Sequence, residues 1–323
     1  MFVYINEYGY RVSKKNDLLV VEHTNGETED YPVNALHAVY FAGEGRISKA
    51  ILLELAKRNI DILMMSEHGK PMAYIYPLWI KPKTWNLWER QISLGKEKRK
   101  YLARKFVIKA IAAKAVLLTE LAKSRKRSNN DIAVKLLSYR NRIRGVEKRA
   151  KNIRIENFDI LKNTLMGLEG FSAKLYFEAL RFVIPKEAGY SGTRTRRPPK
   201  DLFNSVISFG YAYLKYLVER ELVFHGMNPY NGILHNEHDK IYPFLTFDVM
   251  EGFRHSFVDR IAIGLISKRV LQVEKHTRNF NGGIYLNKYG RTIVYNALLK
   301  ERMKRFNKLI SKEVTGLIRE INN

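Results

Sequence analysis

The stretch from Asn228 to Arg260 reads NPYNGILHNEHDKIYPFLTFDVMEGFRHSFVDR and sets a few reactive side chains in an apolar background. His235 ends a short apolar run, Asp248 follows thirteen residues later, and Glu251 comes three residues after Asp248. The i,i+3 spacing predicts that both carboxylates share one face of a helix. One imidazole and two carboxylates suit a hard divalent cation, and carboxylates among apolar neighbours need a countercharge. The alternative is a helix N-terminus whose acids are favoured by the helix dipole, beside a histidine satisfied in the core.

The composition describes a folded protein with enough residues for two cores. The chain has 323 residues, of which 46% are hydrophobic and 12% aromatic, and it contains no cysteine. The lack of cysteine excludes disulfides, thiolate zinc sites and cysteine nucleophiles, and it suggests a reducing compartment. No uncharged apolar run reaches the length of about 18 residues that spans a membrane. The N-terminus lacks a signal-peptide pattern, so we expect no membrane association and a cytoplasmic location.

Positive charge is concentrated in the later part of the chain. The formal net charge is +25 overall, but residues 1–80 carry −2, with 8 Lys and Arg against 10 Asp and Glu. Residues 81–156 carry +17, with 23 basic side chains against 6 acidic ones. Such asymmetry predicts a polyanionic partner that binds the later part only. The basic helical stretches lack the wide apolar face of membrane-surface helices, which favours nucleic acid as that partner.

Local patterns predict an α+β fold, with a β-rich domain over residues 1–77 and a larger, all-α catalytic and DNA-binding domain over residues 78–323. Short runs rich in Val, Tyr and Ile, separated by turn residues, predict strands. The predicted strands are 2–5, 11–13, 18–22, 28–33, 37–41, 61–65 and 72–76, with one helix at 48–58. Gly43-Glu44-Gly45 lies between a strand and a helix, but no glycine follows at the third fingerprint position, so we interpret it as a turn.

Three features of the helical part bear on function. Glu169 lies between Gly167 and Gly170 in an apolar helical pattern, which makes it either a third metal ligand or a solvent-facing glutamate. The loop PKEAGYSGTRTRRPPK at 185–200 is basic and rich in proline and glycine, as expected of a segment that contacts phosphate. Its predicted DNA-contacting residues are Arg194, Arg196, Arg197 and Lys200. A polar stripe on the following predicted helix, formed by Asn204, Ser208 and Tyr211, is interpreted as surface.

Together these motifs resemble the CRISPR-associated integrase family, that of the first Cas protein. The resemblance rests on Gly167-Leu168-Glu169-Gly170, Asn204 through Tyr211, Asn228-Pro229-Tyr230, Gly232 to His235, Phe247 to Glu251, Phe253-Arg254, Val258-Asp259-Arg260 and Gly282-Gly283 with Tyr285-Leu286. It extends over nearly the whole chain.

The resemblance implies a metal-dependent DNA endonuclease and integrase that inserts spacer DNA into a CRISPR array. The family's metal ligands fall on Glu169, His235 and Glu251, and Asp248 matches a nearby active-site acid, so these four are the expected catalytic residues. The cofactor would be Mn²⁺ or Mg²⁺, and a histidine ligand favours Mn²⁺. The expected partners are double-stranded DNA, a second copy of the chain joined through the β-rich domain, and a small second Cas protein.

Two other functions use the same residues. A metal-dependent repair or junction nuclease would have the same site but would not join a 3′-hydroxyl end to a repeat-bearing duplex. A non-catalytic nucleic-acid scaffold would need no divalent metal, because its acids would act as helix caps.

Overall fold

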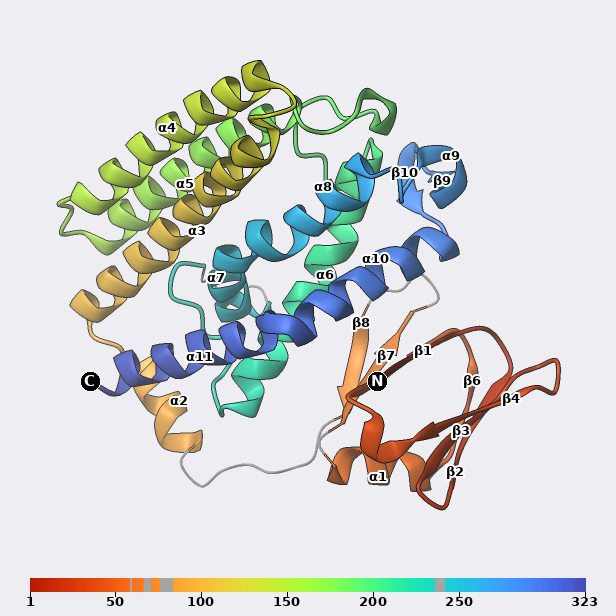
Figure 1. Cartoon of the computed structure of the whole chain (residues 1–323). Coiled ribbons are helices and arrows are strands. Elements are labelled where there is room, and N and C mark those ends of the chain that lie inside the picture. Colours follow the sequence, from red (N-terminus) through yellow and green to blue (C-terminus); the bar gives the residue numbers. More distant parts are fainter. Residues whose placement is uncertain (59, 67–70, 76–83, 236–241) are drawn as a thin grey trace. The chain divides into compact units, whose positions relative to one another are not determined.

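The computed structural model describes residues 1–58, 60–66, 71–75, 84–235 and 242–323. The chain divides into two compact units, Met1–Ile80 and Lys81–Asn323. The first unit contains all but two of the described strands, and the second is mostly helical (Figure 1). The α+β class predicted from the sequence is therefore confirmed. The predicted boundary between residues 77 and 78 lies outside the described residues.

The first unit holds two four-stranded sheets. One has the order β1-β5-β7-β8, in which the first three strands are parallel and β8 is antiparallel to β7. The other has the order β4-β3-β2-β6, in which only the β2–β6 pair is parallel. The elements are β1 Phe2–Asn6, β2 Tyr10–Lys15, β3 Leu18–Glu22, β4 Thr28–Pro32, β5 Ala38–Ala42, β6 Gly45–Ile47, α1 Lys49–Lys57, β7 Asp61–Met65 and β8 Pro71–Ile75.

Both sheets and α1 share one apolar core. Buried side chains such as Val12 from β2, Val39 from β5 and Leu55 from α1 belong to it. The Gly43–Gly45 segment differs in part from the predicted turn, because Gly45 already begins β6. Gly43 has φ of +83°, and a Cβ there would lie 2.2 Å from the carbonyl oxygen of Glu7, so the tight turn before β6 requires glycine.

The second unit is built from helices and one small hairpin. Its elements are α2 Thr84–Ile92, α3 Lys96–Arg125, α4 Asn130–Asn152, α5 Phe158–Leu180, α6 Leu202–Phe224, α7 Phe244–Phe253, α8 Arg260–Ser267, α9 Val273–His276, β9 Thr277–Phe280, β10 Gly283–Leu286, α10 Lys288–Glu301 and α11 Asn307–Asn322. Helices α3, α4 and α5 pack side by side as a bundle (Figure 1). The β9–β10 hairpin is the strand structure that the expectation of an all-α domain omitted.

A π-helical segment, Arg254–Asp259, joins α7 to α8 and packs against α6. The approach is close at Gly210, where a Cβ would lie 2.4 Å from a methyl carbon of Val258. Glycine therefore lets α6 and this segment meet without a gap. A π-helical turn shifts the direction of the side chains that follow it, and such turns are frequent at functional sites.

Candidate active site

A cavity of about 730 Å³ lies in the helical unit, lined by α3, α5, α6, α7, the π-helical segment, the loop after α5 and the segment after α6 that carries His235. Glu169, His235 and Glu251, which are far apart in sequence, all line it. The other polar side chains in its wall include Lys114, Lys174, Glu178, Arg194, Arg196, Tyr211, Arg254 and His255. The fold therefore brings the three predicted metal ligands to one cavity.

Asp248 holds the segment that carries His235. Its carboxylate, without exposed surface, accepts backbone N–H bonds from Ile233 at 2.7 Å, Leu234 at 3.0 Å and His235 at 3.2 Å. Gly232 permits this turn, because a Cβ there would lie 2.0 Å from the His235 carbonyl oxygen. Asp248 is not among the residues that line the cavity. It lies behind the histidine and holds the imidazole ring in one orientation.

The same carboxylate fixes the ring of His235. Nδ1 of His235 lies 2.7 Å from Oδ1 of Asp248, and an ionised carboxylate can only accept, so Nδ1 donates. Burial acts to lower the pKa of His235, but the hydrogen bond and charge of Asp248, with weaker help from Glu251 and Glu169, raise it. In the neutral ring Nε2 is then the nitrogen with a free lone pair. A histidine whose other nitrogen is bound to a carboxylate is the usual form of a metal-ligating imidazole.

Glu169 lies on α5 and forms an ion pair with a lysine that the sequence did not reveal. Nζ of Lys114, on α3, is 2.7 Å from Oε1 of Glu169, and its side chain is 1% exposed against 28% for the glutamate. Burial acts to raise the pKa of Glu169, but the charge of Lys114 and its hydrogen bond outweigh burial and lower it. A Cβ at Gly167 or Gly170 would touch nothing within 4 Å. Neither glycine is therefore required by packing inside this unit.

Glu251, near the end of α7, pairs with Arg254 at 2.7 Å. The Arg254 guanidinium also lies over the ring of Tyr211, 4.9 Å from its centroid. Burial acts to lower the pKa of Arg254, but the charges of Glu251 and, more weakly, of Tyr211, Glu169 and Asp259 together raise it. Two carboxylates on the cavity wall are thus neutralised by two cations of the chain, Lys114 for Glu169 and Arg254 for Glu251.

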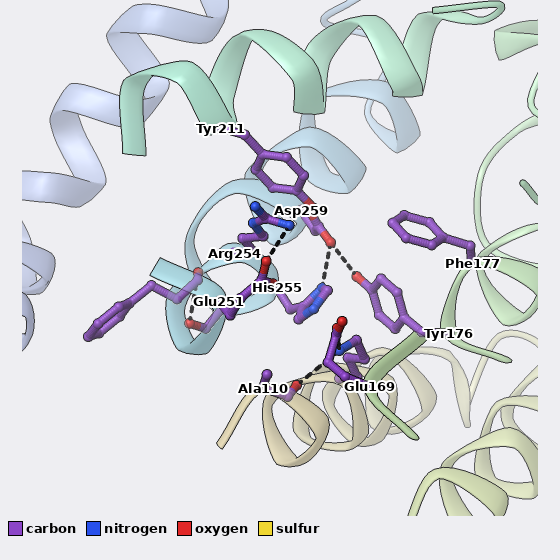
Figure 2. A network of polar contacts seen from close by, with 12 residues as sticks. Ala110, Glu169, Tyr176, Phe177, Tyr211, Glu251, Arg254, His255 and Asp259 are labelled. Carbon is purple, nitrogen blue, oxygen red and sulfur yellow. Dashed lines mark hydrogen bonds and ion pairs between the residues drawn. The ribbon is translucent and has the colours of Figure 1, made fainter. Parts of the chain in front are cut away.

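A second buried carboxylate, Asp259, collects three donors next to the cavity (Figure 2). Tyr176 donates at 2.9 Å, Tyr211 at 2.6 Å, and Nδ1 of His255 lies 2.8 Å from the carboxylate. Burial, and then the charge of Asp259, raise the pKa of both tyrosines well above the usual value, so both are protonated donors. The i,i+4 spacing of His255 and Asp259 was visible in the sequence but carried no prediction.

The predicted surface stripe on α6 is wrong. Asn204 is fully buried, and its side chain accepts from Arg194 at 2.9 Å and donates to the carbonyl of Thr193 at 2.9 Å. Arg194 also donates to Ser208 at 3.0 Å. The stripe therefore anchors the loop after α5, and Arg194 is its half-buried anchor. The other predicted DNA contacts of this loop, Arg196, Arg197 and Lys200, are exposed.

The donors at the cavity fit a hard divalent cation in their chemistry. They are two carboxylates and one imidazole nitrogen that Asp248 has left available. In the part of the chain that the structure describes, no three His, Asp or Glu side chains are grouped closely enough to hold a metal ion. The reason is visible in the ion pairs, because Glu169 and Glu251 turn toward Lys114 and Arg254. Metal binding would have to draw both carboxylates away from these partners.

The sequence matches the model of the family described as CRISPR associated protein Cas1 over residues 3–300, and the chain belongs to that family. A relative from Archaeoglobus fulgidus, called CRISPR-associated endonuclease Cas1 1, is 29% identical over 280 residues, which is 85% of this chain and 80% of the relative.

Two solved structures share the fold. A casposase bound to integration product has a TM-score of 0.80 at 20% identity, covering 99% of this chain and 90% of the casposase. A Cas6-RT-Cas1–Cas2 complex has a TM-score of 0.74 at 19% identity, covering 100% of this chain and 35% of the matched chain. None of the described helices combines the length and apolar character needed to cross a bilayer.

Proposed function

We propose that this chain is a divalent-metal-dependent DNA endonuclease and integrase that joins a 3′-hydroxyl DNA end to a phosphodiester of a CRISPR array. The observation that carries the proposal is the convergence of Glu169, His235 and Glu251 on one cavity of a strongly basic helical unit. Membership of the Cas1 family and the fold shared with an integration-product complex support it. Action on a chromosomal array would place the protein in the cytoplasm.

Glu169, His235 and Glu251 would hold the metal ion, and the imidazole donor favours Mn²⁺ over Mg²⁺. Bound there, the ion would lower the pKa of an attacking hydroxyl and offset charge on the phosphate oxygens. Lys114 and Arg254, separated from these carboxylates when the metal binds, would remain in the cavity wall and add positive charge where the phosphate would lie. Asp248 keeps the ring of His235 in one orientation.

The test of this function is the joining of a labelled 3′-hydroxyl strand to a repeat-bearing duplex in Mn²⁺, with chelator as the reference. We expect joined product that depends on both the metal and the 3′-hydroxyl. Cleavage without joining would favour the alternative function, a metal-dependent repair or junction nuclease. DNA binding with neither reaction, in the presence of the second Cas protein, would contradict the proposal.

The DNA would lie across the exposed basic side chains of the bundle and of the loop after α5. Exposed side chains on or near α4 include Lys126, Arg127, Lys135, Arg142, Lys148 and Arg149. None of these six side chains takes part in an ion pair among the described residues, whereas Arg144 and Lys151 of the same helix pair with Glu147. Contacts of this kind set affinity and its salt dependence without reading sequence.

Reversing Arg196 and Arg197 together to Glu should flatten the salt dependence of duplex binding. Each lost phosphate contact removes about 0.9 from the slope of log affinity against log salt, so the slope should fall by roughly two. Titrations at several salt concentrations measure it. The matched control reverses Arg11 and Arg46, two exposed arginines paired across β2 and β6. An equal slope for the loop variant and the parent would remove the loop from the interface.

The proposed assembly contains a second copy of this chain, and the fold shared with a complex that contains Cas2 supports a second Cas protein as a further partner. The β-rich unit carries little net charge and so has no electrostatic reason to bind DNA. Among the described strands, none pairs with the outer edge of β8, where Met72 is 65% exposed. Such an edge is a natural place for another chain to add.

Met72→Lys should therefore shift the protein from dimer to monomer at micromolar concentration, because a lysine on a strand edge opposes pairing. Light scattering gives the mass directly. Leu53→Lys is the matched control, since Leu53 is 50% exposed but lies on α1. If both variants keep the mass of a dimer, the β8 edge is not the contact.

A further inference from the structure

We propose that His255 is a second catalytic histidine, whose Nε2 takes the proton of the attacking hydroxyl. The inference rests on the proposed function and adds the general base for the same reaction. It is carried by a buried imidazole in the cavity wall, which is bound at one ring nitrogen and unpartnered at the other.

The bound side is fixed by Asp259. Nδ1 of His255 lies 2.8 Å from Oδ2 of Asp259, and the side chains are 3% and 0% exposed. An ionised carboxylate accepts only, so the hydrogen is on Nδ1 and the neutral ring has its lone pair on Nε2. Tyr176 and Tyr211 supply two further donors to Asp259, at 2.9 Å and 2.6 Å. The carboxylate is thus held in place and cannot turn away from the histidine.

The other ring nitrogen, Nε2, lies on the side of the ring away from the bond to Asp259. Nε2 of His255 is buried and has no hydrogen-bond partner among the described residues, although His255 lines the cavity with Glu169 and His235. Figure 2 shows its ring between the carboxylates of Asp259 and Glu169. Tyr176 packs edge-on against the ring, 4.5 Å between centroids, and limits its rotation. A buried polar atom left unbonded is costly, and a substrate hydroxyl in this part of the cavity would satisfy it.

The arrangement matches what a general base needs. A carboxylate hydrogen-bonded to one imidazole nitrogen sets the tautomer and stabilises the cation that forms when the other nitrogen accepts a proton. In the joining step, the hydroxyl oxygen forms a bond to phosphorus while its proton passes to Nε2. The bond from phosphorus to the leaving 3′ oxygen breaks, and that oxygen takes a proton from water. The imidazolium then returns its proton to solvent, so the step balances.

The other polar side chains of the site are already engaged, which explains why a second histidine is useful. Nδ1 of His235 is bonded to Asp248 and its Nε2 is assigned to the metal, so His235 has no nitrogen left for the hydroxyl proton. Lys114 and Arg254 are donors engaged with Glu169 and Glu251. His255 offers an unpartnered ring nitrogen, Nε2, at the same wall, while its Nδ1 is held by Asp259.

The test uses the full-length protein and two variants. His255→Asn keeps a side-chain donor toward Asp259 and removes Nε2, whereas His255→Ala leaves a space for added imidazole. Joining is measured in single turnovers at saturating Mn²⁺ and DNA. We expect His255→Asn to slow joining by about 10²-fold, in line with general-base catalysis, with Mn²⁺ and duplex affinities within about threefold of the parent. Imidazole should restore His255→Ala by at least about tenfold.

The control is His225→Asn, because Nε2 of His225 is bonded to Ser311 at 3.0 Å and His225 is not among the cavity residues. It should join at the parental rate. Joining by His255→Asn within about threefold of the parent, or a slow His255→Ala that imidazole does not restore, overturns the inference. A loss traced to weaker Mn²⁺ binding overturns it as well. If the parent fails to join at all, or if Glu169→Gln joins normally, it is the proposed function that fails.

Discussion

Glu169→Gln should lower strand joining and cleavage by about 10³-fold or more in Mn²⁺, while duplex affinity stays at the parental value. The neutral amide is a poor ligand for a hard cation, so the metal loses one of two charged donors. The glutamine oxygen can still accept from Lys114, whose ammonium is buried 2.7 Å from Oε1 of the glutamate. Substitution by Gln therefore separates lost chemistry from a lost ion pair, which Glu169→Ala would combine.

His235→Ala and Glu251→Gln should give losses of similar size, and the double variant Glu169→Gln/His235→Ala should be no worse than either single one. Groups that act as a unit are not additive. Glu221→Gln is the matched control, because Glu221 is also a buried acid paired with basic neighbours but lies outside the cavity. Near-parental joining by His235→Ala would make that histidine a structural residue and remove the proposed site.

Asp248→Asn should lower both the apparent affinity for the metal ion and the thermal stability of the protein. The carboxylate accepts from three backbone N–H groups and one imidazole, and an amide would direct its own NH₂ at some of these donors. Each donor left unsatisfied costs about 1–3 kcal/mol, and each kcal/mol lowers the melting temperature of a domain of this size by about 2–4 °C. Loss of the group that orients a ligand raises the half-saturating metal concentration about 10–100-fold.

Thermal unfolding and Mn²⁺ titration of joining measure the two effects, and joining should recover in part at high Mn²⁺. Asp159→Asn is a suitable control, because Asp159 is an exposed acid in the first turn of α5. An unchanged half-saturating Mn²⁺ concentration in Asp248→Asn would show that Asp248 does not orient His235.

The sequence singled out Glu169, His235 and Glu251 because each carries a local signal, and the structure places all three on one cavity, where their role as metal ligands is our proposal. Glu251 is marked by its apolar helix, His235 by the turn before it, and Glu169 by flanking glycines. The i,i+3 spacing could not show that Asp248 points at the preceding loop while Glu251 lines the cavity. Three residues along a helix turn a side chain by about 60° from a full rotation, enough for Glu251 to line the cavity and Asp248 to accept from the preceding loop.

What the sequence missed depends on contacts between distant helices. Lys114 meets Glu169 across 55 positions, and Tyr176 meets Asp259 across 83. The periodicity within one helix cannot predict partners on another helix. In the sequence, Lys114 therefore could not be distinguished from the other basic residues of its helix. The prediction that the polar stripe on α6 is exposed was wrong for the same reason. The loop after α5 covers the stripe, and Arg194 of that loop donates to Asn204 and Ser208.

The central claim is that Glu169, His235 and Glu251 hold one divalent ion in this cavity. A titration of the full-length protein with Mn²⁺ tests this claim without any turnover. Electron paramagnetic resonance measures the free ion, and the bound ion is obtained by difference. We predict one tightly bound Mn²⁺ per chain for the parent and for Glu221→Gln, and loss of that ion in Glu169→Gln and in His235→Ala. Undiminished Mn²⁺ binding in both ligand variants, with their fold intact, would contradict the account.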